Sequence, residues 1–122
     1  MGNNREAEDD LKEALDIRRQ LAKSDPSAYQ PLVAITLNNL GKLYSNTGRL
    51  NEAEATLGEA LRINRQFAKT DPAASQSNIA DQLVSLSVIY SETGRFKEAE
   101  ASLQEVLGIY RRLAIDNPTI YE

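Results

Sequence analysis

The stretch LGKLYSNTG at residues 40–48 decides the fold, because a near copy, LSVIYSETG, follows 46 residues later at residues 86–94. The same spacing separates three copies of Glu-Ala-Glu, which begin at Glu6, Glu52 and Glu98. A period of this length marks one supersecondary unit that cannot bury its apolar face alone and must stack on copies of itself. The sequence therefore predicts an elongated solenoid that presents a surface for binding.

Two helical patterns alternate within each period. Apolar residues recur every three or four positions across residues 31–46, which predicts a first helix there, helix A, with Pro31 in its first turn. Gly48 favours the left-handed backbone that ends a helix. A second helix, helix B, is predicted over residues 50–69, and it is expected to stop there because Asp71 precedes a proline.

Continued in both directions, the pattern predicts an all-α chain. The five helices are expected in the order B-A-B-A-B over residues 5–23, 31–46, 50–69, 77–92 and 96–115. They form a single domain over residues 1–122, an α-solenoid of antiparallel helix hairpins.

Each terminal B helix lacks an A helix on one side. Leu11 and Leu15 of the first helix belong to an apolar face that such a neighbour would cover, whereas solenoid ends usually carry a polar outer face. Leu11 and Leu15 are therefore the predicted residues for self-association through the uncapped ends.

The composition excludes several classes of protein. The hydrophobic fraction is 41% and the charged fraction is 26%, as in ordinary folded proteins, and the net charge of −4 offers no basic field for nucleic acid. The absence of Cys and His excludes disulfides, thiol chemistry, imidazole catalysis and the usual zinc sites. No apolar run approaches the ~18 residues of a membrane span. We expect a soluble, cytoplasmic protein without a cofactor or metal.

Two sets of charged residues have both a structural and a functional interpretation. Arg19, Arg65 and Arg111 occupy one position in every B helix. A repeated arginine more often bonds the neighbouring unit than a ligand, because its forked donors suit fixed pairing. The acidic run at residues 6–10 is interpreted as favourable charge near a helix N-terminus instead of a metal site.

The repeated residues resemble the tetratricopeptide repeat. That family combines a Leu-Gly pair, an aromatic residue, a turn glycine and two small residues on its second helix. The matching residues are Leu40, Gly41, Tyr44, Gly48, Ala53 and Ala60, repeated as Leu86, Ser87, Tyr90, Gly94, Ala99 and Val106. The period exceeds the family's usual ~34 residues, and the additional residues are expected to lengthen helix B and its exit loop, residues 68–76.

The longer period is similar to the extended repeats of kinesin light chains and to arrays in multidomain bacterial signalling proteins. In tetratricopeptide arrays a second stripe of each A helix lines a groove for the partner. The groove residues implied here are Ile35, Asn38, Asn39, Lys42 and Ser45, followed in the next repeat by Asp81, Val84, Val88 and Ser91. Asn38 and Asn39 either bind a peptide backbone or are simply solvated. Val84 and Val88 are covered either by a ligand or by the superhelix itself.

The resemblance implies a non-catalytic scaffold that holds a peptide or a partner protein. Asn38 and Lys42 occur in the reverse order to the carboxylate clamp of chaperone-binding members, so that clamp is not expected. The alternative is a structural module that self-associates through its terminal B helices. No nucleic acid or membrane partner is expected, and no enzyme, since no acid–base pair lies in a turn or pocket that would shift its pKa.

Overall fold

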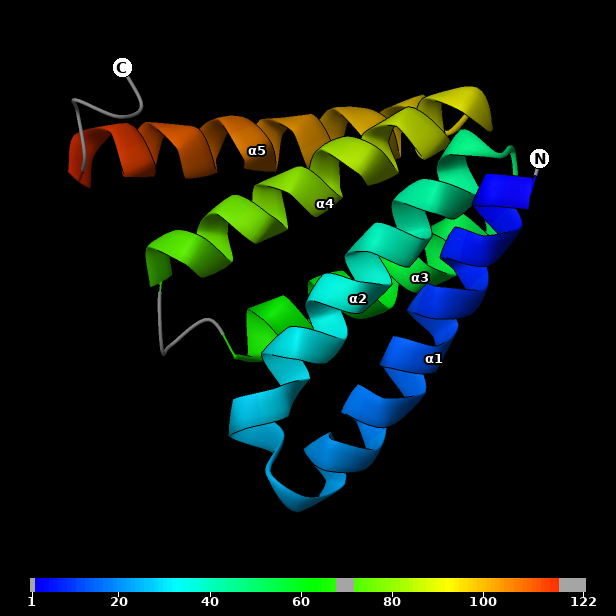
Figure 1. Ribbon diagram of the computed structural model, residues 1–122. Coiled ribbons are helices and arrows are strands. Elements are labelled where there is room, and N and C mark those ends of the chain that lie inside the picture. The colour runs from blue at the N-terminus through cyan, green and yellow to red at the C-terminus, as the bar shows by residue number, and fades with distance from the viewer. Residues whose placement is uncertain (1, 68–71, 117–122) are drawn as a thin grey trace.

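The computed structural model describes residues 2–67 and 72–116, with side chains at residues 4–67 and 73–115. The helices are α1 (Gly2–Ser24), α2 (Pro26–Asn46), α3 (Leu50–Gln66), α4 (Pro72–Glu92) and α5 (Phe96–Asp116) (Figure 1). No strand occurs in these ranges, so the predicted all-α order of five helices is confirmed. None of the described helices is both long enough and apolar enough to cross a membrane.

Helix α2 begins at Pro26, and the prediction that it begins at Pro31 is wrong. The side chain of Asp25 accepts a hydrogen bond from the backbone N–H of Ala28 at 3.3 Å, and Pro26 occupies the first position, where its missing N–H costs nothing. Pro31 lies inside the helix. The carbonyl that loses an intrahelical partner there belongs to the exposed Ser27, which water can solvate.

Helix α4 likewise begins at Pro72 and not at residue 77, so residues 72–76 are helical. The additional length of the repeat therefore extends the A helices at their N-termini, and the expectation of a long exit loop through residue 76 is wrong. Helix α3 ends at Gln66, earlier than expected, and the predicted helix end at residue 69 lies outside the described residues.

Each helix packs on the next one along the chain, from α1 on α2 to α4 on α5, as the ribbon in Figure 1 shows. Val33, Leu37, Leu40 and Tyr44 of α2 are buried, as the helical pattern predicts. One core cluster extends from α1 to α4 and a second joins α4 to α5, and Leu61 of α3 contacts both. The core is therefore continuous along the stack.

A Thr-Gly-Arg turn joins A to B in both repeats. Gly48 has a φ of 80° and Gly94 a φ of 78°, the left-handed backbone that glycine adopts at little cost. The guanidinium of Arg49 stacks over the ring of Tyr44 at 4.4 Å, and it also pairs with Glu8 of α1. The second repeat has the corresponding contacts: the guanidinium of Arg95 stacks over the ring of Tyr90 and pairs with Glu54 of α3.

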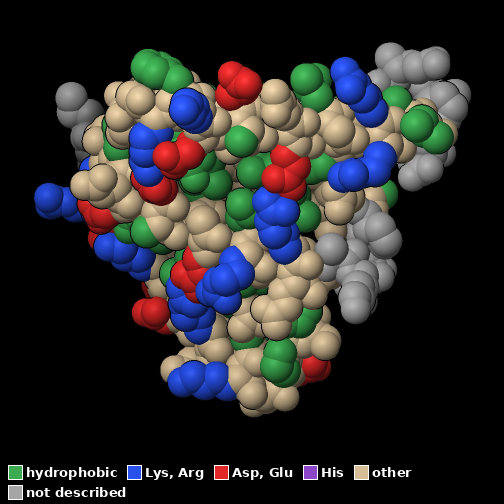
Figure 2. Space-filling view, turned by 180° about the vertical axis from the view of Figure 1, so that it is seen from behind, with side chains coloured by type: hydrophobic (Ala, Val, Ile, Leu, Met, Phe, Trp, Pro, Cys, Tyr) green, Lys and Arg blue, Asp and Glu red, His purple; other side chains and the backbone are tan. Residues whose placement is uncertain are grey.

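A second repeated ion pair joins each B helix to the next B helix. Arg19 of α1 binds both carboxylate oxygens of Glu59 on α3, at 2.7 and 3.1 Å. Arg65 of α3 binds Glu105 on α5 in the same way, at 2.9 and 3.1 Å. The structural interpretation of this arginine is thus confirmed for two of its three copies. Figure 2 shows basic and acidic side chains interspersed over the face of the molecule that it presents.

We expect Gly41→Ala to lower the free energy of unfolding by about 1–3 kcal/mol, because the added methyl group would overpack the core and force neighbouring side chains or backbone to shift. A Cβ at this position would lie 2.6 Å from Cγ of Leu57, which is fully buried and has no room to move. Gly58→Ala is the control: a Cβ there meets no neighbour, so the better helix propensity of Ala should raise stability by about 0.5–1 kcal/mol. Urea denaturation measures both, and a stabilised Gly41→Ala variant would contradict the packing.

The ion pairs predict a loss of stability in acid. Lys12 first, and Arg49 second, hold the pKa of the Glu8 carboxyl at about 2, below its ordinary 4.5. Because the pKa is lower in the folded state, Glu8 adds stability above pH 4.5, and this contribution disappears as the pH falls through 2. The deficit of Glu8→Gln relative to the native chain should therefore be present at neutral pH and vanish near pH 2, as measured by urea denaturation.

Glu13→Gln is the matched control, since Glu13 lies exposed on the same helix and forms no ion pair among the described residues. A deficit of Glu8→Gln that is the same at neutral and acidic pH would show that the ion pair is not its cause.

Candidate functional site

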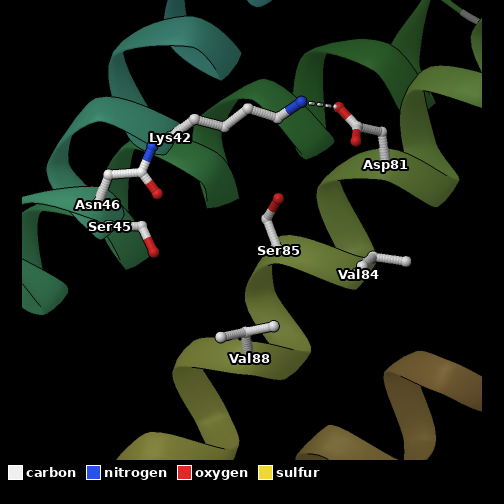
Figure 3. Close-up of a pocket in the computed structure, with 7 residues that line it drawn as sticks. All are labelled: Lys42, Ser45, Asn46, Asp81, Val84, Ser85 and Val88. Atoms are coloured by element: carbon white, nitrogen blue, oxygen red, sulfur yellow. Dashed lines mark ion pairs between the residues drawn. The ribbon is translucent and has the colours of Figure 1, made fainter.

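A pocket of about 330 Å³ lies between α2 and α4. Its lining consists of Lys42, Ser45 and Asn46 from α2, and Asp81, Val84, Ser85 and Val88 from α4 (Figure 3). Lining residues recur at helical spacing because positions three or four apart share one face of a helix. The structure therefore brings together five of the nine predicted groove residues, and we call this space the groove.

An ion pair spans the groove. The ammonium group of Lys42 lies 2.7 Å from Oδ2 of Asp81, and the side-chain amide of Asn38 donates a hydrogen bond to the same oxygen at 3.0 Å. These contacts connect α2 to α4. Sequence reasoning placed all three residues on the groove but missed their pairing, since a separation of about forty positions leaves no local signal.

Asn38 lies outside the pocket lining but bonds to Asp81, which belongs to it, so Asn38 is not merely a solvated residue. Its amide nitrogen is committed to Asp81, and its Oδ1 is buried without a hydrogen-bond partner among the described residues. A buried polar atom without a hydrogen-bond partner destabilises the folded state. The hydrogen bond from the amide nitrogen to Asp81 is therefore the side-chain contact that fixes Asn38 in this position.

The two valines of the groove are exposed, Val84 to 39% and Val88 to 47%. No described part of the chain covers them, so the superhelix itself does not bury these side chains. Three other predicted groove residues lie exposed but outside the pocket lining. They are Ile35, Asn39 and Ser91.

The predicted self-association residues are core residues instead. Leu15 is only 9% exposed, and Leu11 packs against the same core cluster, because α2 covers this face of α1. The prediction that they form an uncovered end is therefore wrong. The large apolar side chains that α1 does expose are Ile17 and Leu21.

The Thr-Gly-Arg turn was also missed as a structural element, although its signal was present. Thr47 donates from its hydroxyl to the carbonyl of Leu43 at 2.8 Å, and Thr93 donates in the same way to Ile89. These hydroxyls satisfy carbonyls at the helix end. An exact recurrence of three residues at the repeat spacing could have identified the element.

Two family models match the chain, and both are described as tetratricopeptide repeat. The first matches residues 1–66 and the second residues 73–118. Comparison with curated proteins and with solved structures finds no match. The likeness to kinesin light chains and to bacterial signalling arrays therefore stays a prediction.

We expect Asp81→Ala to change the free energy of unfolding by less than about 1 kcal/mol, as is usual for solvated ion pairs. Both partners of the Lys42–Asp81 pair have side chains 44% exposed, so water replaces much of the lost attraction. Urea denaturation measures the effect, with Glu92→Ala on the exposed surface of α4 as the control. A loss of several kcal/mol would mean that the pair mainly stabilises the fold.

Proposed function

The chain belongs to the tetratricopeptide repeat family, and on this premise we propose that it is a non-catalytic scaffold whose groove between α2 and α4 holds a peptide or a partner protein. Repeats of this family generally mediate protein–protein interaction, and the family is generally not enzymatic.

The observation that carries the proposal is the pair of exposed valines in a pocket that also offers hydrogen-bonding groups. Burying apolar surface stabilises a complex by roughly 25 cal/mol per Å², so Val84 and Val88 favour an apolar side chain of the partner. Ser45, Asn46 and Ser85 line the same pocket and offer hydroxyl and amide groups. Such groups suit the N–H and C=O groups of an extended peptide.

The charge of the groove indicates which partners it favours. Lys42 is already neutralised by Asp81, so the groove offers no free cation for a terminal carboxylate. This differs from the carboxylate clamp of chaperone-binding members. We therefore infer that an apolar anchor side chain contributes more to binding than an anionic one, and that affinity depends only weakly on salt.

A random-peptide library selected on the immobilised chain supplies ligands whose affinity can be measured by fluorescence anisotropy. Val88→Glu should weaken binding at least about tenfold, because it places an unpaired charge on the apolar wall; a tenfold change corresponds to about 1.4 kcal/mol. Ile17→Glu is the matched control: Ile17 is 54% exposed on α1 and outside the groove, so its replacement should leave affinity unchanged.

Circular dichroism of each variant verifies that the helices remain folded. Equal affinity of the native chain and the folded Val88→Glu variant for every selected peptide would contradict the proposal.

A further inference from the structure

Helix α5 carries an uncovered apolar stripe. Phe96 is 67% exposed, Leu103 45%, Leu107 54% and Tyr110 43%. Their spacings of seven, four and three residues place them on one face of the helix. In Figure 2 apolar side chains are visible along the edge of the molecule that α5 forms. We call Phe96, Leu103, Leu107 and Tyr110 the α5 stripe.

The repeat shows what this stripe corresponds to inside the molecule. One period before Leu103 and Leu107 stand Leu57, which is fully buried, and Leu61, which contacts both core clusters. Two periods before them stand Leu11 and Leu15, the residues that sequence reasoning selected for self-association. In α1 and α3 an A helix lies on this face, whereas no described helix lies on the face of α5. Among the described helices, the exposed copy of this repeat position therefore lies on α5 and not on α1.

Two charged residues flank the α5 stripe, and both lack the ion pair that their counterparts form. The counterparts of Arg111 are Arg19 and Arg65, which pair with glutamates of the next B helix. The counterparts of Glu100 are Glu8 and Glu54, which pair with the turn arginines.

Among the described residues Arg111 and Glu100 form no ion pair, and Glu100 accepts only a long hydrogen bond from Gln104. By helical geometry the two charges lie on the same side of the stripe.

From this arrangement we propose that α5 packs against α5 of a second copy of the chain, antiparallel, about a two-fold axis near Glu105. At the centre of the interface, Leu103 of each copy then packs against Leu107 of the other copy. Glu100 and Arg111 lie about 8–9 Å from the axis on opposite sides along the helix, given a rise of ~1.5 Å per residue. Each glutamate therefore meets the arginine of the other copy.

The charges favour a second copy as the occupant. In an antiparallel pair related by a two-fold axis, the same flank of each helix meets its own equivalent, so a flank with one acid and one base is complementary to itself. Tyr110 also distinguishes the α5 stripe from the internal interfaces. At the repeat position of Tyr110, α1 carries Arg18, which donates a hydrogen bond to Thr36 on α2 at 2.6 Å, and α3 carries Asn64. An aromatic residue with a hydroxyl suits a pairing beside Glu100 of the other copy.

The interface is independent of the proposed function, because no groove residue belongs to α5. Variants of the α5 stripe should therefore keep the affinity for selected peptides, and groove variants should keep the association. The two proposals can fail separately.

Sedimentation equilibrium over a series of concentrations tests the association. The native chain should approach twice the monomer mass, and Leu107→Glu should remain a monomer. Glu100→Arg alone, or Arg111→Glu alone, should raise the dissociation constant at least about tenfold, since each brings like charges together at two symmetric sites. The double variant with both changes should recover the native dissociation constant, and an equimolar mixture of the two single variants should associate more tightly than either alone.

Ile17→Glu on α1 is the matched control and should associate like the native chain. Circular dichroism confirms that each variant is folded. A native chain that stays monomeric at its highest soluble concentration overturns the proposal and leaves the α5 stripe to a helix of another protein. Association that survives Leu107→Glu but is lost in Ile17→Glu also overturns it, because a different surface would then be responsible.

Discussion

The structure depends on one constraint: the leucine faces of the B helices α1 and α3 are buried only because further helices stack on them. Leu11 and Leu15 lie under α2, Leu57 is fully buried in the same core cluster, and the partly buried Leu61 packs against both clusters. Neither helix of a hairpin buries this face alone, so the hairpins stack in one direction. The stacking brings α2 and α4 together across the groove, and no described helix covers the corresponding face of α5.

The ion pairs have a different role from the apolar core. Arg19–Glu59 and Arg65–Glu105 join B helices that do not otherwise pack on one another, and the turn arginines reach back to the preceding B helix. Their side chains are partly solvated, so each pair contributes little free energy. Because the pairs recur at one spacing, they favour one stacking register of the hairpins. A shift of one hairpin along the next would separate every pair.

The repeat spacing predicts which residues line the groove, but it does not predict the contacts that these residues make. Val84, Val88 and Lys42 follow from helical periodicity once α2 and α4 are recognised as equivalent helices. Their contacts across the groove depend on the angle between two hairpins, which is set by the packing of many side chains at once. The commitment of Asn38 to Asp81, and the neutralisation of Lys42, are consequences of that packing.

The sequence by itself determined the helix class, the five-helix order, the turn glycines and the buried face of the A helix α2, because these depend on local backbone preference and on periodicity. It did not determine where the A helices begin: Asp25 and Pro26 initiate α2, and the helix tolerates Pro31 because the carbonyl of Ser27 is exposed. Only the tertiary structure decided that Leu15 is buried while its counterpart Leu107 is exposed. Identical local patterns carry no record of which copy has a neighbouring helix on its face.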